Sequence, residues 1–333
     1  MAPSCRRANC PQAKASELHA FLTDPYFSGG MLAVSAPGAI AELPGFDHVV
    51  SVTRNSGAAM TSVGRYAPPS RAGDPLTACS TRTSLRMHAP SFGTVLAVER
   101  IPASRKPHSL HFFDQDGVML HEAFLTSITD DLALEELTSG WNGAGDLAQD
   151  ESEYPLPASK DWLPKPIAQS AGAHRDAGFH LDSILRDNGL ARRASLPAWG
   201  AGHAWQVEVD VLFNLFTLLT DVRMPLVFGV GNVGLVQVHR GEVDGVKRFG
   251  TLMRISSKCC NVTLSLDDIE EIWVSRIESQ GRIGHMLEIY DWRYHCVAQF
   301  KDCEESDETL SNFWRQLLMT LPRRQTHQSD HIR

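Results

Sequence analysis

One spacing dominates this sequence: similar residues recur 177 positions apart. The stretch SLHFFDQDG, residues 109–117, has the same order of apolar, polar and turn-forming residues as MLEIYDWRY, residues 286–294. Without any gap, the spacing relates five pairs of identical residues: Asn55 and Asn232, Gly57 and Gly234, Gly64 and Gly241, Leu110 and Leu287, and Asp114 and Asp291. Two copies are too few for a solenoid, so the sequence predicts two similar halves that pack together.

The pattern of residue classes extends this match beyond the identities. FGTVLAV, residues 92–98, falls on IEEIWVS, residues 269–275, which places one predicted strand on another. After the hairpin the spacing drops to 176 and holds, which predicts a one-residue deletion at the turn. It pairs Phe124 with Phe300, Leu134 with Leu310, and Leu137 with Phe313. We therefore expect residues 45–140 and 222–320 to superpose as one motif.

Each half shows the same succession of predicted elements. In the second half, apolar residues at helical spacing predict a helix over residues 205–219, and alternating patterns predict strands from residue 224 onward. A closing helix is expected at residues 308–320, and its counterpart around residues 131–137. The predicted fold class is α+β, with two pseudo-repeat halves, each a large antiparallel sheet flanked by helices.

The region between the halves differs from both of them. Residues 142–169 are rich in proline and acidic residues, which predicts a linker between an N-terminal repeat at 1–141 and a C-terminal repeat at 170–333. The C-terminal part begins with a predicted helix, AHRDAGFHLDSILRDNGL, which has no counterpart in the first half and stops at Asn188-Gly189. Its place beside the joint between two sheets makes it a candidate for function.

Composition excludes several classes of protein. The net charge of -8, without a dense basic stripe, argues against a nucleic-acid partner. No apolar run approaches the roughly 20 residues of a membrane span, and the first residues do not resemble a signal peptide. The seven cysteines lack CxxC spacing, which favours reduced thiols over a disulfide framework or a zinc site. We therefore expect a cytoplasmic protein.

Several stretches together resemble a known family. The firmest is Gly231-Asn232-x-Gly234 followed by Gln237-x-His239-x-Gly241-x-Val243, and it is supported by VTRNSG at residues 52–57 and by the doubled plan itself. With these features the chain resembles the cytoplasmic haem-utilisation proteins of Gram-negative bacteria, the HemS/HmuS/ChuS family, over about residues 45–320. The resemblance implies haem b (hemin) bound at one site between the repeats, for intracellular haem trafficking or oxidative haem degradation. It leaves open whether this chain is a haem-degrading enzyme. The implied partners are the cytoplasmic face of a haem importer and a haem oxygenase.

The same resemblance implies the site residues. His180 corresponds to the family's axial histidine, which would bind the haem iron, and His174 is the alternative in the same segment. Arg86 corresponds to the family's distal arginine, a catalytic and haem-binding position, and His88 follows it two residues later on the expected strand. Haem iron needs a donor such as a neutral imidazole, and the propionates favour guanidinium partners.

A second interpretation follows from two departures from the family pattern. The family's axial histidine lies in an Asp-Val-His-x-Phe motif, and His180 comes two residues later than that motif places it. The family's C-terminal basic patch has no clear match in FKDCEESDETL, residues 300–310. These departures are consistent with a degenerate HemS-like interaction or regulatory module that no longer binds haem. A Soret band on addition of hemin separates the two interpretations.

Overall fold

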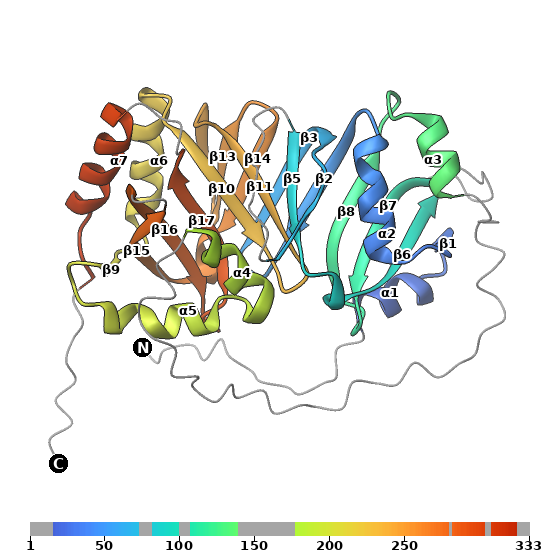
Figure 1. The fold of residues 1–333 in the computed structure, drawn as a ribbon, viewed down its shortest axis with the longest axis horizontal. Coiled ribbons are helices and arrows are strands. Elements are labelled where there is room, and N and C mark those ends of the chain that lie inside the picture. The colour runs from blue at the N-terminus through green and yellow to red at the C-terminus, as the bar shows by residue number, and fades with distance from the viewer. Residues whose placement is uncertain are drawn as a thin grey trace, which may run out of the picture.

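The computed structural model of the protein describes residues 16–72, 82–99, 107–138, 177–279, 282–303 and 308–324. The predicted linker at residues 142–169 lies outside these described residues. The fold is α+β, as predicted, with two similar halves side by side (Figure 1). No helix in the described ranges is long and apolar enough to cross a membrane.

The N-terminal half begins with a helix, a short strand and a second helix, continues in a run of strands and closes with a helix. In chain order its elements are α1 (Glu17–Thr23), β1 (Gly29–Met31), α2 (Ala36–Glu42), β2 (Val49–Arg54), β3 (Ala58–Tyr66), β4 (Ser70–Arg71), β5 (Arg82–Met87), β6 (Phe92–Glu99), β7 (Pro107–Asp114), β8 (Met119–Leu125) and α3 (Asp131–Leu137).

The C-terminal half follows the same plan after two helices, α4 (Ala177–Asp187) and α5 (Leu190–Ser195). Its further elements are β9 (Ala204–Val207), α6 (Val211–Asp221), β10 (Pro225–Gly231), β11 (Leu235–Glu242), β12 (Gly245–Phe249), β13 (Leu252–Ser257), β14 (Cys260–Ser265), β15 (Ile269–Ser279), β16 (Arg282–Asp291), β17 (Cys296–Asp302) and α7 (Glu308–Thr320). The predicted bounds of α7 are confirmed.

The single helix predicted over residues 205–219 is wrong, because its first residues form a strand. Trp205 and Val207 pair with Val274 and Ile272 on β15, and the helix α6 begins only at Val211. The corresponding strand of the first half, β1, pairs with β6 in the same way. The repeat unit therefore starts earlier than residue 45, at a strand and a helix that the sequence pattern did not reveal.

Strands of the two halves pair with one another across the joint. The described strands form one 17-stranded sheet, in which β5 of the first half pairs with β11 of the second, and β14 of the second pairs with β3 of the first. The two pairings have equivalent registers: Met87 lies opposite Leu235, and Leu264, 177 positions after Met87, lies opposite Ala58. Each half thus completes the sheet of the other, and the joint is a continuous sheet rather than a loose contact.

Asn55 and Asn232 confirm the duplication at the level of single hydrogen bonds. Each amide nitrogen donates to two carbonyl groups. One belongs to the residue just before the other asparagine, and the second lies on the last strand of the other half. Each amide oxygen accepts from the backbone N–H groups two and three residues further on. The donor–acceptor pairs of the nitrogens are Asn55 Nδ2 to Gly231 O at 2.8 Å and Val297 O at 2.9 Å, and Asn232 Nδ2 to Arg54 O at 3.2 Å and Leu120 O at 2.9 Å.

Asp114 and Asp291 occupy equivalent turns, also as predicted. Each aspartate ends a strand, and its Oδ1 accepts from the backbone N–H groups two and four residues later. The residue three positions later has a positive φ in both turns: 75° at Gly117 and 65° at Tyr294. A tyrosine is strained in this left-handed conformation, whereas glycine is not. The turn is thus kept in both copies although its residues differ.

The predicted one-residue deletion after this turn is wrong. Val50 lies opposite Phe124, and Val227, 177 positions after Val50, lies opposite Lys301. Lys301 is therefore the counterpart of Phe124, and the spacing of 177 holds through β8 and β17. Matching Phe124 to Phe300 shifted the strand by one residue, which assigns side chains to the wrong face of a sheet.

Helices cover both faces of the sheet. One face packs against α2 and α3 in the first half and against α6 and α7 in the second, and these layers hold the two largest apolar clusters (Figure 1). On the opposite face, α1 covers the first half and α4 with α5 covers the second. Among the described residues α4 has no counterpart in the first half, so the α4 face of the second half is where the molecule departs from its internal symmetry.

Candidate functional site

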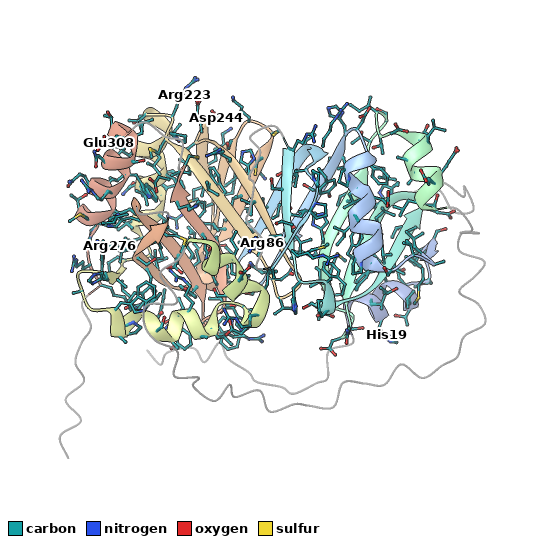
Figure 2. All side chains as sticks on the ribbon, in the orientation of Figure 1. His19, Arg86, Arg223, Asp244, Arg276 and Glu308 are labelled. Carbon is teal, nitrogen blue, oxygen red and sulfur yellow. The ribbon has the colours of Figure 1, made fainter. Side chains whose placement is uncertain are left out.

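Arg86 lies on β5 at the joint between the halves, beside α4 (Figure 2). Its strand neighbours Leu85 and Met87 pack into the apolar cluster of the first half. Because side chains alternate along a strand, Arg86 points to the other face, where α4 lies. Its side chain is only 2% exposed, and both Nε and Nη2 lie 2.8 Å from Oδ1 of Asp182 on α4. Arg86 therefore points from its strand to the helix that carries His180, as predicted.

The helix α4 is held on the sheet by an apolar stripe. Ile184 and Leu185 are almost fully buried, which stabilises each contact by roughly 1.5–3 kcal/mol relative to exposure. Asn188 and Gly189 have φ values of 55° and 80°, and Gly189 N donates to the carbonyl of Ser183. This left-handed end is a common way to terminate a helix, and it confirms the stop predicted at these two residues.

The predicted histidines are placed differently from one another. His180 is in the first turn of α4, but its side chain lies outside the described part of the structure, and His174 lies outside the described residues altogether. His88 follows the end of β5: its Nδ1 is 2.9 Å from Oγ of Ser91, and its N–H donates to the carbonyl of Gly234. The structure thus brings Arg86 to the helix of His180, while the hydrogen bonds of His88 lead to the turn after β5.

The sheet beneath α4 offers a polar group beside a residue without a side chain. Gln299 on β17 lies opposite Gly229 on β10, is 4% exposed, and its Nε2 has no hydrogen-bond partner in the described structure. Cδ2 of Leu181 on α4 is 3.5 Å from the place that a Cβ of Gly229 would occupy. A buried donor without an acceptor is unusual in a folded protein and is expected where a ligand supplies the acceptor.

A buried ion pair fixes α5 on the same face. Arg192 donates from Nε and Nη2 to Glu288 on β16, at 2.6 and 2.7 Å, and both side chains are fully buried. Burial opposes the charge of Arg192, but Glu288 outweighs this effect and raises the pKa of the guanidinium above its ordinary value. Tyr290 donates its hydroxyl to Glu288 at 2.9 Å, and burial, followed by the neighbouring carboxylate, raises the pKa of Tyr290 well above its ordinary range. This network ties α5 to β16 through a fully buried ion pair.

Sequence reasoning missed Asp182, Gln299 and the Arg192–Glu288 pair. A signal existed for Glu288, which is a lone charge between the apolar residues Leu287 and Ile289 on a strand. Asp182 gave no such signal, because an aspartate on a helix is most often solvated.

The described residues have the chemistry that a haem needs, but the space between α4 and the sheet is too narrow for its macrocycle. Arg86 and Gln299 supply donors for anionic or oxygen-bearing groups, while Val236 and Val238 on β11 supply apolar surface. However, Leu181 already packs on Gly229, so a macrocycle between α4 and the sheet would displace the helix from β10. The residues therefore fit the group if α4 moves and Asp182 releases Arg86.

Solved structures share this fold, among them a heme-binding protein and a heme oxygenase. Holo-PhuS, a heme-binding protein from Pseudomonas aeruginosa, has a TM-score of 0.68 at 22% identity and covers 90% of this chain and 88% of its own. ChuS, an E. coli heme oxygenase, has a TM-score of 0.69 at 20% identity and covers 91% of each chain. At these identities the likeness establishes the shared fold.

The sequence itself has relatives of nearly full length. The hemin transport protein HmuS of Yersinia pestis is 23% identical over 288 residues, which are 85% of this chain and 82% of the relative. The hemin transport protein HemS of Yersinia enterocolitica is 23% identical over 283 residues, which are 83% of this chain and 81% of the relative. The pattern of the family described as the haemin-degrading HemS/ChuX domain matches residues 18–141 and again residues 189–321. The chain therefore belongs to the haemin-degrading HemS/ChuX family.

Proposed function

We propose that the protein binds haem b between α4 and the sheet formed by β5, β11, β10 and β17, for haem trafficking or degradation. The observation that carries this proposal is the contact of Arg86 with Asp182. It joins the arginine that the family resemblance marks on β5 to α4, a helix without a counterpart among the described residues of the first half. The family membership and the relatives named for hemin transport support the same function.

In this proposal His180 binds the iron from α4, and His174 is the alternative ligand. Arg86, once released from Asp182, would donate to an oxygen-bearing group bound at the iron or to a propionate, because a guanidinium stays protonated and is a poor iron ligand. His88 is a further candidate contact, once its bond to Ser91 is given up. The bound haem supplies the redox chemistry, and the protein supplies the ligand, the polarity of the distal side and access.

We further propose that the protein works in the cytoplasm, with the cytoplasmic face of a haem importer as the source of haem and a haem oxygenase as one acceptor. Ring opening by the protein itself is the alternative fate of the haem. The description of HmuS as a hemin transport protein supports delivery to an acceptor. The family's description as haemin-degrading and that of ChuS as a heme oxygenase support ring opening.

The test is a hemin titration followed by the Soret band. We expect His180→Ala to shift or weaken the band, and His239→Ala to leave it unchanged. His239 is a matched control because it lies on β11 but faces away from α4, with its Nε2 3.0 Å from Oγ of Ser257. Loss of the band in His174→Ala, with no change in His180→Ala, would transfer the axial role to His174.

Two further outcomes decide between the functions. Bleaching of the bound haem with ascorbate and oxygen supports degradation, whereas a stable complex supports a carrier. A wild-type protein that gives no Soret band at any hemin concentration would contradict haem binding and favour a degenerate interaction module.

A further inference from the structure

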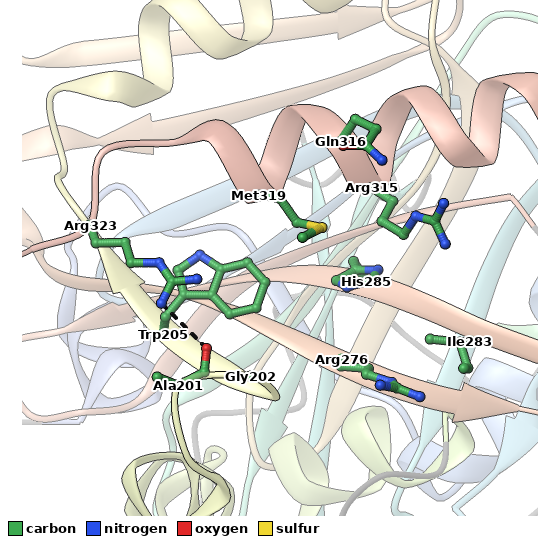
Figure 3. A pocket seen from close by; sticks show the side chains of 10 residues that line it. All are labelled: Ala201, Gly202, Trp205, Arg276, Ile283, His285, Arg315, Gln316, Met319 and Arg323. Atoms are coloured by element: carbon green, nitrogen blue, oxygen red, sulfur yellow. Dashed lines mark hydrogen bonds between the residues drawn. The ribbon is translucent and has the colours of Figure 1, made fainter.

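A second site lies on the opposite face of the C-terminal sheet from α4. A cavity of about 360 Å³ opens between the last turns of α7, the edge of the β15–β16 hairpin and the segment before β9 (Figure 3). This volume is within the range of small-molecule sites. The side chains that matter for its chemistry are Trp205, Arg276, His285, Arg315, Met319 and Arg323.

Strand alternation shows that this cavity is separate from the α4 face. Arg276 and His285 lie opposite each other on β15 and β16. Their neighbour Ser275 accepts a hydrogen bond from Arg192 of α5, so Ser275 faces the α4–α5 side and Arg276 faces the other. On that other side, Trp314 of α7 donates to the carbonyl of His285. The cavity is therefore covered by α7 and is not part of the proposed haem site.

The lining of the cavity is strongly cationic. Three arginines contribute to it, and none of the residues that line it in the described structure is acidic. Arg323 lies over the ring of Trp205, 4.9 Å from its centre, while Arg315 and Arg276 lie on either side of His285 (Figure 3). An anion placed among these guanidinium groups is attracted by all of them.

Buried polar atoms in the same cavity lack hydrogen-bond partners in the described structure. His285 is 6% exposed, and its Nδ1 has no hydrogen-bond partner in the described part of the chain. Nε of Arg315 and Nε1 of Trp205 are also buried without a hydrogen-bond partner in the described part of the chain. Burial, followed by the charges of Arg315 and Arg276, lowers the pKa of His285 to about 4, so the imidazole is neutral at physiological pH. Such orphaned polar atoms are costly unless a ligand completes them.

We propose that this cavity binds a small organic oxyanion. A carboxylate or phosphate group accepts from Arg315, Arg276 and His285, and a flat apolar body lies beside Trp205 and Met319. The guanidinium groups match the paired oxygens of such a group, while the indole and the thioether favour an apolar body over a bare ion. The ligand class is thus an aromatic or similarly compact carboxylate or phosphate ester.

The test is calorimetric titration of the full chain with four probes of related shape. Benzoate and phenyl phosphate present the two oxyanions on the same ring, benzyl alcohol presents the ring without the charge, and inorganic phosphate presents the charge without the ring. We expect the first two to bind with dissociation constants below about 1 mM and the last two to bind at least tenfold more weakly. The tighter of benzoate and phenyl phosphate identifies the oxyanion.

Variants locate the binding. Arg315→Gln should weaken the tighter probe about tenfold to a hundredfold, because it removes one charge-assisted contact. Arg254→Gln removes the same charge from an exposed position on β13 and should change nothing. Hemin titration of Arg315→Gln should match the wild type, which separates this site from the proposed haem site. Equal affinity of both variants for the probe, or no saturable binding of either aromatic anion to the wild type, would overturn the proposal.

Discussion

Arg86 and Asp182 join a strand of the first repeat to a helix that has no counterpart among the described residues of that repeat. The guanidinium is almost fully buried, whereas the carboxylate keeps 22% of its side chain exposed. A buried arginine needs such a partner, because an unpaired buried charge is strongly destabilising. In the proposed site, the same pair also occupies the donor that a haem would use. The contact therefore stabilises the structure and, if haem binds as proposed, competes with it for Arg86.

This competition predicts that Asp182→Asn binds hemin more tightly. The amide oxygen can still accept a hydrogen bond from Arg86, so the fold is retained, but the ionic part of the contact is lost. Weakening such an ion pair by about 1 kcal/mol should raise hemin affinity roughly fivefold. The Soret titration measures the change.

The matched control is Asp221→Asn, which removes an equal charge from an exposed position at the end of α6. It should leave hemin affinity unchanged. Weaker binding in Asp182→Asn than in the control would show that the carboxylate assists haem rather than competing with it.

Arg86→Ala should slow haem breakdown more than it weakens haem binding. A distal donor acts on groups that become more charged during the reaction, while binding also draws on the iron ligand and on apolar contacts. Loss of one charge-assisted hydrogen bond costs about 1.5–3 kcal/mol, or about tenfold to a hundredfold in the bleaching rate. Hemin titration and ascorbate bleaching are compared for the same preparations.

Arg248→Ala, at an exposed position on β12, serves as the control for net charge. If Arg86→Ala changes neither measurement, the residue has only its structural role beside Asp182. If it loses binding and bleaching in the same proportion, Arg86 holds a propionate rather than a distal group.

Much of the fold could be predicted because the signals are local. The asparagines at 55 and 232 hold their turns through bonds to N–H groups two and three residues away, so the same short motif appears twice in the sequence. The bounds of α7 follow from apolar residues at helical spacing. The aspartates 114 and 291 close equivalent hairpins for the same local reason.

The rest depends on contacts that no local pattern encodes. Alternation along β5 shows that Arg86 and Leu85 face opposite sides, but not that β11 of the other half is the partner strand. The one-residue slip at Phe124 arose because apolar residues were matched without knowing the strand register. Asp182 became a candidate site residue only when α4 was placed over β5.

The reciprocal asparagines predict matched losses of stability. Asn55→Ala and Asn232→Ala each remove two donated and two accepted hydrogen bonds at the joint. Each should lower the free energy of unfolding by about 2–4 kcal/mol, and the two losses should agree within about 1 kcal/mol. Urea unfolding at pH 7 measures both.

Asn214→Ala is the control, since Asn214 is exposed on α6, where alanine is a better helix former. It should leave stability unchanged or slightly raised. A loss confined to one of the two joint asparagines would show that the halves do not share the joint equally.

The paired aspartates predict opposite effects of pH, although their turns are equivalent. Burial opposes the charge of Asp291, but hydrogen bonds from His295 and Ser56 outweigh it and hold the pKa below the ordinary value of 3.8. For Asp114, burial raises the pKa above 3.8; the N–H groups of its turn oppose the rise, and nearby carboxylates add to it. A depressed pKa means that the charged form stabilises the fold, and a raised pKa means the reverse.

The sign of each effect follows from proton binding. The stability due to Asp291 is fully present above pH 3.8 and is lost as the pH falls through the lower, folded value. Asp291→Asn should therefore destabilise the protein by about 1–2 kcal/mol at pH 7, with the difference vanishing in acid.

For Asp114 the folded state holds its proton more tightly, so its charge costs stability as the pH rises above 3.8. Asp114→Asn keeps the accepting Oδ1 and should be neutral or stabilising at pH 7. Urea unfolding of both variants between pH 3 and 7 measures the contrast, and equal losses in the two variants at pH 7 would contradict it.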